Sequence, residues 1–479
     1  MFYSFSFAPN PRWTTFFPPG PEIYTYLEEV CNKHGITEKI QLDTDVTECR
    51  WLKDEELWEV TIKHLLPGMG ELGQKDRAKM LQEHGESSVY SGTEKIRTKV
   101  VLSCVGGLVE PKGWPEDIPG VDDFKGSIFH SARWDHGVDF NDKDVVVVGT
   151  GCSAAQFVPQ LMRSPFNAKS VTQLMRSPPW VVDRLIPPGG HEWWKKNSPQ
   201  LMTYVPGLRK LFRLLLAAKV EYDFRLFGGG QWHEQERKKV EQRLLRHMKR
   251  TVPEKYHEIL TPDYGVGCKR RIFDATWFPA LNDPKIELTT LPLTSVQERS
   301  VTLGPGRLYP DPGKPSKVPT EQKTVPADII VLANGFDVQN WLHPLKVIGR
   351  QSKDLLNTMM ERGGPQAYQG TAMDGFPNFF IIFGPNTVTG HTSVIMASEN
   401  MANYAMRFIK PLLKGDMRTV EVKMEAEQEY TRDIQEALSK TVWMSGGCRS
   451  WYYKDGWNST VLPYVYFLHC LTLPLTQDV

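Results

Sequence analysis

The chain lacks closely spaced cysteines. Its seven cysteines are odd in number and none lies in a C-x-x-C spacing; they are Cys31, Cys49, Cys104, Cys152, Cys268, Cys448 and Cys470. Zinc sites and small disulfide frameworks both need closely spaced cysteines, so this pattern argues against either. We expect reduced thiols, no metal site and a cytoplasmic protein.

The chain also lacks an excess of charge and a run long enough to span a bilayer. Its 57 Lys and Arg balance 56 Asp and Glu, for a net charge of +1, so nothing indicates nucleic acid or an anionic membrane as a partner. The longest apolar run, Val461 to Leu475, holds two prolines and a histidine and is too short for a membrane span. Residues 1–7 show no basic segment before a long apolar core, so we predict no signal peptide. A chain of 479 residues with this composition is typical of a globular protein of two or three domains.

The strongest local pattern is a valine strand followed by a glycine turn. Residues 144–148 read Asp-Val-Val-Val-Val, as in a strand buried on both faces of a parallel sheet. The next residues follow the dinucleotide fingerprint G-x-G-x-x-A; they are Gly149, Thr150, Gly151, Cys152, Ser153, Ala154, Ala155 and Gln156. The first glycine permits the tight turn, the second lets a pyrophosphate approach the backbone, and the free N–H groups of the following helix favour a phosphate. The alternative is an ordinary glycine-rich turn between a strand and a helix.

A second strand of this unit is predicted over residues 171–176. Where an NAD enzyme carries an acid for the ribose hydroxyl, this strand ends in Met175 and Arg176. An arginine suits the 2′-phosphate of NADP, so NADP is favoured over NAD. A surface arginine at a strand end is the alternative.

The remaining elements are predicted from periodicity. An amphipathic helix is expected over 21–34, hairpin strands over 40–46 and 58–62, a buried strand over 100–107, and a helical insertion over 186–262. Further strands are expected near 286–290, 327–335 and 379–383, a loop over 303–326, and a helix over 392–413.

Several motifs together resemble the class B flavoprotein monooxygenases, specifically the Baeyer–Villiger monooxygenases. Residues 124–135 fit the family signature F-x-G-x-x-x-H-x-x-x-W-[PD] at every fixed position, through Phe124, Gly126, His130, Trp134 and Asp135. Other matching stretches lie at residues 267–274, 333–336, 375–380, 384–386 and 448–452, in the family's order. The resemblance therefore covers nearly the whole chain.

The resemblance implies an α/β fold with two dinucleotide-binding, Rossmann-like domains, the NADP domain being inserted in the FAD domain. It implies this division: the remainder of the FAD domain and a linker at 1–135, the NADP domain at 136–185 and 266–325, the helical insertion at 186–265, and the rest of the FAD domain at 326–479. The implied cofactors are FAD and NADPH. The implied reaction takes molecular oxygen up as a flavin C4a-peroxide, which adds to a ketone and leads to an ester or lactone. The chain resembles fungal secondary-metabolism members that act on aromatic polyketide ketones.

The resemblance also carries roles for single residues. Arg270 matches the arginine that stabilises the peroxide and the developing oxyanion, Lys269 matches a lysine that reaches the NADP 2′-phosphate, and Trp451 matches a tryptophan against the nicotinamide cofactor. His130 is expected to couple linker movement to the NADP domain, or to be a structural histidine. Three residues match positions that contact FAD, namely Tyr3, Val46 and Val394.

The chain departs from the family at its start. The family opens with a separate G-x-G-x-x-G for FAD, then a G-x-W motif and an aspartate near the flavin, none of which we find in the first residues. We therefore expect the first βαβ unit of the FAD domain to be missing. A smaller departure is Asn334, where the family has threonine. Two alternatives to ketone oxidation stay open: an N- or S-oxygenating flavin monooxygenase, and an inactive, FAD-deficient NADP-binding protein.

Overall fold

The valine strand stands in the middle of a five-stranded parallel sheet. The computed structural model describes residues 3–274, 276–305, 321–338, 341–388, 390 and 393–465. The sheet has the order β11-β8-β7-β15-β6, with β6 at Ser127–His130, β7 at Asp144–Val148, β8 at Ser170–Leu174, β11 at Ile286–Thr289 and β15 at Ile329–Leu332. The prediction of a doubly buried strand is confirmed, because Val145, Val146 and Val147 are at most 1% exposed. Helix α3, at Cys152–Leu161, joins β7 to β8 and completes the predicted βαβ unit.

The sheet reaches beyond the segments expected for the NADP domain, since both β6 and β15 belong to it. An antiparallel sheet lies between β11 and β15 in the chain, with β12 at Leu293–Gln297, β13 at Ser300–Leu303 and β14 at Lys323–Pro326. The loop predicted over 303–326 is therefore wrong at its end, where β14 pairs with β13. Residues 306–320 of that loop lie outside the described residues.

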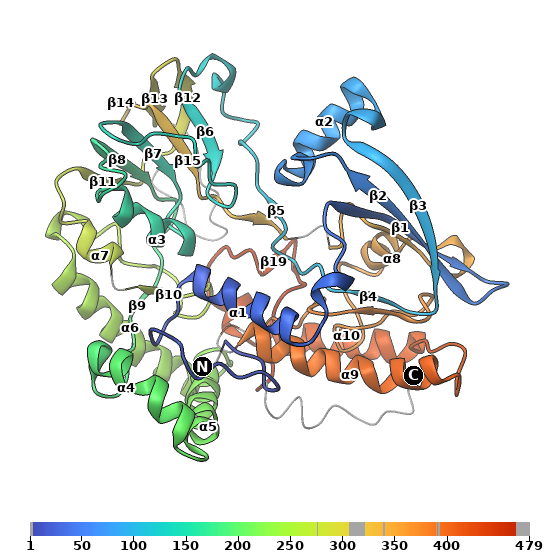
Figure 1. Cartoon of the computed structure of the whole chain (residues 1–479). Helices are drawn as coiled ribbons and strands as arrows, with labels where there is room; N and C mark the ends of the chain where they lie inside the picture. The colour runs from blue at the N-terminus through green and yellow to red at the C-terminus, as the bar shows by residue number, and fades with distance from the viewer. Residues whose placement is uncertain are drawn as a thin grey trace.

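Three helices follow the short strand β9, at Val181–Asp183, within the segment predicted to be helical. They are α4 at Gly190–Tyr204, α5 at Leu208–Tyr222 and α6 at Gln231–Thr251. The chain then returns through β10, at Ile272–Asp274, which pairs in parallel with β9. The short helix α7, at Trp277–Ala280, leads into β11. Figure 1 shows these helices in green below the five-stranded sheet.

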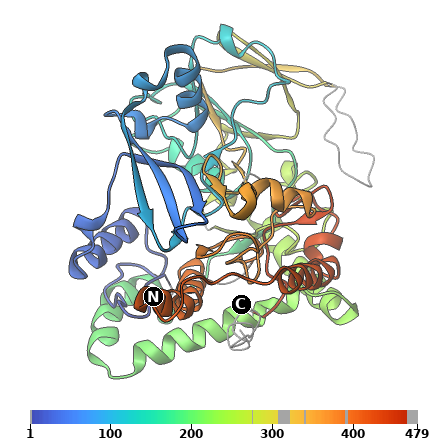
Figure 2. The ribbon, with the colours of Figure 1, turned by 90° about the vertical axis from the view of Figure 1, so that its right-hand side faces the viewer.

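A four-stranded sheet forms the second lobe and faces the viewer in Figure 2. Its order is β17-β1-β2-β3, with β1 at Thr44–Leu52, β2 at Leu57–Leu65, β3 at Tyr90–Thr98 and β17 at Lys346–Ile348. The predicted hairpin is confirmed as β1 and β2, but β1 begins at Thr44. Ile40 and Leu42 precede it with exposed side chains, so alternation alone set the predicted start too early.

The other elements surround this lobe. A parallel pair joins β4, at Val101–Ser103, to β18, at Phe379–Ile381. The helices are α1 at Gly20–Lys33, α2 at Gln74–His84, α8 at Leu355–Glu361, α9 at Val394–Lys414, α10 at Met424–Ser439 and α11 at Val442–Ser445. A last hairpin joins β19, at Tyr453–Lys454, to β20, at Trp457–Asn458. Helices α1 and α9 confirm the two helices predicted outside the insertion.

Two chain segments connect the lobes, and they run side by side (Figure 1). Strand β5, at Glu110–Pro111, leads toward β6, and strand β16, at Phe336–Asp337, leads back from β15. They pair in antiparallel fashion, and the Lys112 N–H donates to the carbonyl of Gly335 at 2.9 Å. The Asn334 amide adds a bond to the carbonyl of Gly113 at 3.2 Å. The connection is thus a two-stranded ribbon.

One prediction about the cysteines is wrong. Cys268 and Cys448 form a buried disulfide, although their sequence spacing gave no sign of it. Among the other cysteines of the described chain, Cys31, Cys49, Cys104 and Cys152 are free thiols; Cys470 lies outside the described residues, as does most of the apolar run 461–475. The described residues contain no cluster of side chains suited to a metal ion. None of their helices has both the length and the apolar character needed to cross a bilayer.

Candidate nucleotide site

The two glycines of the fingerprint have different structural roles. Gly149 has a φ of +125°, and a Cβ there would stand 2.5 Å from the carbonyl oxygen of Ala333. Gly151 has an ordinary φ of −76°, caps α3 without a side-chain hydrogen bond, and would place a Cβ in open space. The first glycine is therefore needed by the fold, whereas the second leaves room above the first turn of α3. This arrangement fits a pyrophosphate at the helix N-terminus.

A buried polar pair holds the glycine turn in place. Gln173, on β8, is 0% exposed and donates to the carbonyl of Gly149 at 2.9 Å. Its amide oxygen accepts from the Trp277 indole N–H, also at 2.9 Å. Because both ends of the amide are bonded inside the core, the turn is fixed before any ligand arrives.

Cationic side chains gather where β8 ends. Met175 is buried, at 1% exposure, whereas Arg176 is exposed. Lys269 donates to the hydroxyl of Ser177 at 2.5 Å and lies over the ring of Tyr264, 4.5 Å from its centroid. The structure thus brings Lys269 from a distant loop to the residue next to Arg176. A hydroxyl with two cations is a suitable set for a phosphate monoester.

The two neighbouring arginines of the same loop differ in their surroundings. Arg271 is 5% exposed and pairs with Asp223 at 3.1 Å. Burial lowers the pKa of Arg271, and Asp223 opposes that effect. Arg270 is exposed and has no carboxylate partner within the part of the chain that the structure describes. The charge of Arg271 is therefore used within the fold, and the charge of Arg270 faces the site.

Arg270 lies beside the start of α3 and beside the C-terminal loop. It acts electrostatically on both the Cys152 thiol and the Tyr452 hydroxyl: burial raises both pKa values, and the guanidinium works against the rise. Tyr452 is 1% exposed, and its pKa rises to about 12. The ring of Trp451 lies 4.7 Å from that of Tyr452, with part of its surface exposed. The structure thus brings together the fingerprint, Arg270 and Trp451.

Sequence reasoning missed several residues around this cluster. Ser177, Tyr264 and Tyr452 lie far apart in the chain. Ser177 and Tyr264 stand in no motif, and Tyr452 ends the matching stretch 448–452 without a role of its own in the resemblance. Lys112 was missed as well: burial and the positive charge of Arg176 lower its pKa, so it lies close to the same cations.

The signature segment packs against the fingerprint helix. Trp134 stacks on Phe140, with centroids 5.5 Å apart, and meets Phe157 of α3 edge to face at 5.3 Å. His130 ends β6 at 8% exposure. Trp134 of this segment therefore has a packing role here.

His130 faces the returning linker. Its Nδ1 accepts from the Ala132 N–H at 3.0 Å, which leaves the proton of the neutral ring on Nε2. Burial lowers the pKa of His130; the Gly335 backbone and the Asn334 side chain favour the charged form but do not offset the burial. A neutral, buried histidine between two linkers fits the expected coupling role better than proton transfer.

The three residues expected to contact FAD all have accessible side chains. Tyr3, Val46 and Val394 are 39%, 43% and 42% exposed. The described residues, however, offer no second glycine cradle of the βαβ kind. The site around Gly149–Gln156 therefore fits the NADP dinucleotide. For FAD, the described residues supply candidate contacts to the ring system but no glycine turn to hold the pyrophosphate.

A second G-x-G-x-x-G, residues 68–73, was overlooked in the sequence. It follows β2 and precedes α2, but α2 has no buried residue. The chain then enters β3, which is antiparallel to β2, so there is no crossover to a parallel strand. At residues 68–73 the same glycine spacing therefore belongs to a surface connection between two antiparallel strands.

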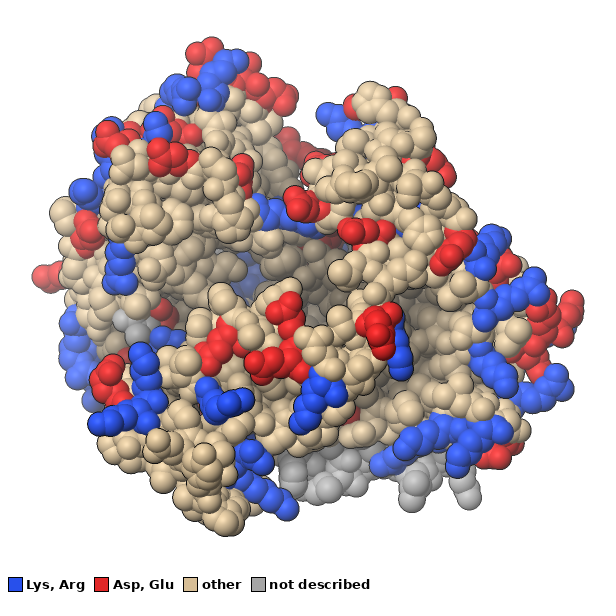
Figure 3. All heavy atoms as spheres, viewed as in Figure 1, with Lys and Arg blue, Asp and Glu red and all other residues tan. Residues whose placement is uncertain are grey.

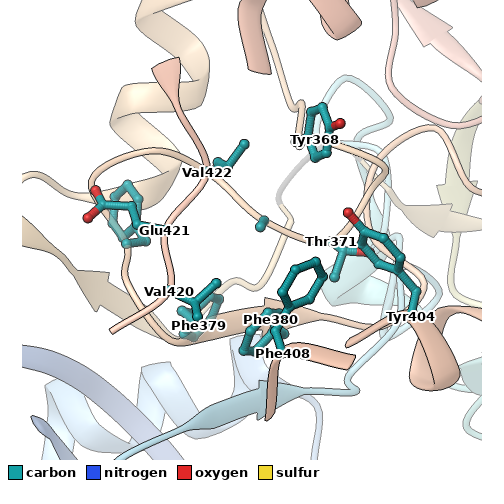
Figure 4. Close-up of a pocket in the computed structure, with 11 residues that line it drawn as sticks. Tyr368, Thr371, Phe379, Phe380, Tyr404, Phe408, Val420, Glu421 and Val422 are labelled. Atoms are coloured by element: carbon teal, nitrogen blue, oxygen red, sulfur yellow. The ribbon is translucent and has the colours of Figure 1, made fainter. Parts of the chain in front are cut away.

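A small closed space lies in the lobe of the four-stranded sheet. Figure 4 shows the side chains around it, which come from β18, α9, the Val420–Val422 segment and the loop of Tyr368 and Thr371. Its volume is about 10 Å³, about enough for one water. It is a packing space and too small for a ligand.

Known proteins that share this fold indicate the class of protein to which the chain belongs. The flavin-binding monooxygenase-like family matches residues 4–194. Two solved structures share the fold: a steroid monooxygenase bound to NADP, with a TM-score of 0.71 at 22% identity over 98% of this chain and 86% of that one, and OTEMO in complex with FAD and NADP, with a TM-score of 0.70 at 20% identity over 96% and 84%. The chain thus shares the overall fold of these two structures.

The curated relatives narrow this class. A Baeyer–Villiger monooxygenase of Pseudomonas aeruginosa is 31% identical, covering 96% of this chain and 77% of the relative. One of Streptomyces coelicolor is 32% identical, covering 96% and 78%. The FAD-binding monooxygenase ktnD of Aspergillus niger is 30% identical, covering 96% and 70%. The chain belongs to the Baeyer–Villiger monooxygenase family.

Proposed function

We propose that the protein uses NADPH, FAD and molecular oxygen to convert a ketone into an ester or lactone. The observation that carries this proposal is the position of Arg270, an exposed guanidinium without a carboxylate partner in the described chain, beside the N-terminus of α3. A permanent cation at such a point stabilises negative charge that develops during the addition of oxygen to a carbonyl. When bound, the flavin supplies the activated oxygen.

Different residues of the chain bind different parts of NADPH. The turn from Gly149 to Gln156 receives the pyrophosphate on backbone N–H groups. Arg176, Ser177 and Lys269 bind the 2′-phosphate, and the electron-rich ring of Trp451 lies along the nicotinamide end. Lys269 is already oriented by its 2.5 Å bond to Ser177 and by the ring of Tyr264.

For the substrate we propose an aromatic polyketide ketone of fungal secondary metabolism. The motifs resemble those of the hydroxyversicolorone monooxygenases, which convert hydroxyversicolorone to versiconal hemiacetal acetate. A fungal FAD-binding monooxygenase, ktnD of Aspergillus niger, lies at 30% identity, in the same range as the two bacterial relatives. N- or S-oxygenation is the second candidate within the same enzyme class.

The test is to purify the chain with FAD present, record flavin absorbance, and follow NADPH oxidation with aromatic ketones and with a thioether. We expect a yellow protein that forms an ester carrying one atom from labelled oxygen gas. Sulfoxide without ester would favour the S-oxygenating alternative. A colourless protein that binds NADP but forms no product would identify the inactive NADP-binding alternative.

A further inference from the structure

Helix α5 presents its apolar side to solvent. Leu211, Leu214, Leu215 and Tyr222 are 53%, 58%, 59% and 63% exposed, and the exposed Ala218 lies between them. These positions follow a spacing of three and four residues, so they form one continuous stripe along a helix of 15 residues. None of the residues of α5 is buried. Figure 3 shows the resulting tan surface at the lower left, with blue atoms at its border.

The opposite side of the same helix is anchored to the fold. Arg213 donates to the carbonyl of Ser4 at 2.9 Å and lies 3.7 Å from the carboxylate of Glu399. Phe212 packs against Trp194 of α4 with centroids 5.1 Å apart. The side of α5 that carries Phe212 and Arg213 therefore faces the fold, and the leucine side faces solvent. A surface helix of a globular protein ordinarily turns its most continuous apolar stripe toward the core.

Cations and tyrosines border the stripe. Lys210 and Lys219 flank it on its two sides, both exposed and without an ion pair in the described chain. Arg209 adds a further positive charge, and Glu221 is the one acid of α5. Tyr204, 78% exposed at the end of α4, and Tyr222 mark the two ends of the apolar surface. Apolar side chains in the middle, lysines at the sides and tyrosines at the ends match the layers of a membrane interface.

We propose that α5 binds in the plane of an anionic membrane surface. Its leucines enter the acyl-chain boundary, and Lys210 and Lys219 reach the lipid phosphates. This mode needs no spanning helix, and it is compatible with the net charge of +1 because the attraction is local. An apolar substrate dissolved in the membrane would then be close to the enzyme.

A second copy of the chain fits this surface less well. The cations of α5 outnumber its one acid, Glu221, so two copies that meet through this helix would bring together two surfaces of net positive charge. Phosphate headgroups supply the opposite charge in excess. The charges around the stripe therefore favour lipid over self-association.

The experiment measures binding of the full chain to vesicles of phosphatidylcholine with and without phosphatidylserine, by cosedimentation, with light scattering to follow the oligomeric state. We expect binding to the phosphatidylserine vesicles that weakens with salt. The variant Leu211→Gln/Leu215→Gln should reduce the partition coefficient about tenfold or more. The matched control Leu42→Gln/Leu413→Gln, at positions 77% and 62% exposed elsewhere, should leave it unchanged.

Charge is tested by Lys210→Glu/Lys219→Glu, which should abolish the preference for phosphatidylserine, against Lys79→Glu on α2 as the control. Equal sedimentation with and without vesicles would overturn the proposal. So would equal binding by the leucine variant and its control. A dimer that dissociates in the leucine variant, without any lipid binding, would assign the stripe to self-association.

Discussion

Cys268 and Cys448 lie 180 residues apart in the sequence and are joined by a disulfide. Cys268 directly precedes Lys269 and Arg270, and Cys448 directly precedes the loop of Trp451. The bond therefore ties together the two loops whose side chains meet at the nucleotide site. The Gly265 N–H, which donates to the carbonyl of Gly446 at 3.0 Å, connects the same loops without sulfur.

Removing this bond should cost stability. Cys448→Ser is expected to lower the free energy of unfolding by about 2–4 kcal/mol, because the unfolded chain gains freedom. Urea denaturation without reductant measures it, and Cys31→Ser, at a free thiol, is the control. Alkylation of Cys268 and Cys448 in the unfolded, unreduced protein would show that the bond does not form.

Arg270→Ala should separate cofactor oxidation from oxygen insertion. We expect ester formation to fall by about 100-fold or more, because a preorganised charge at the reacting centre is lost. NADPH oxidation should continue and release hydrogen peroxide. Product analysis beside NADPH absorbance measures both, with Arg432→Ala, an exposed arginine of α10, as the control. An unchanged ester yield would remove Arg270 from this role.

The two fingerprint glycines should respond differently to alanine. Gly149→Ala forces a Cβ against the Ala333 carbonyl at a positive φ, so we expect a loss of about 1–3 kcal/mol in unfolding free energy. Gly151→Ala meets open space and should keep its stability but weaken NADPH binding about tenfold or more, because the pyrophosphate loses its approach. Thermal unfolding and cofactor titration measure the two effects. Equal stability losses would contradict the different roles.

Preference for NADPH over NADH should depend on Arg176 and Lys269. In the double variant Arg176→Ala/Lys269→Ala, we expect the KM for NADPH to rise about tenfold or more, while the KM for NADH stays the same. Steady-state kinetics with both cofactors measure the ratio. Arg163→Ala, beyond the far end of α3, is the control. A parallel rise for NADH would place the two cations elsewhere on the cofactor.

Stability should fall as pH rises, because of one buried carboxyl group. Burial raises the pKa of Glu427 to about 8, with hydrogen bonding to Asp374 as the next cause; Arg362 bonds both carboxyl groups. Between the ordinary Glu pKa and about 8, the folded protein holds a proton that the unfolded chain has released. Unfolding free energy therefore decreases by at most about 1.4 kcal/mol per pH unit in that window.

Glu427→Gln mimics the protonated side chain and should flatten this dependence. Urea denaturation at pH 6 and at pH 8 compares the two proteins, and Glu429→Gln, exposed on the same helix, is the control. A variant that keeps the full slope would assign the titration to another group.

Local features of the fold could be predicted from the sequence. The turn from Gly149 to Ala154 depends on residues close together in the chain, and the valine strand before it depends on burial on both faces. Both follow from rules that act over a few residues. Helix α5 shows the limit of such rules, since periodicity reveals a two-sided helix without indicating which side faces the core.

Non-local features could not be derived in this way. The bond from Lys269 to Ser177 joins residues 92 positions apart, and only the resemblance to a family directed attention to Lys269. The pairing of Cys268 with Cys448 left no mark in the sequence spacing. Conversely, residues 68–73 match the G-x-G-x-x-G pattern but are not followed by a crossover to a parallel strand, which a dinucleotide-binding unit requires.

The two-stranded ribbon of β5 and β16 connects the two lobes. Because the outgoing and returning chains are bonded to each other, one lobe cannot slide past the other without breaking the β5–β16 pairing and the Asn334–Gly113 contact. The lobes are also joined away from this ribbon, by the Cys268–Cys448 disulfide and by the packing of α6 against α10. A movement of one lobe against the other must therefore strain contacts at two separate places, which holds the loops of the nucleotide site in one arrangement.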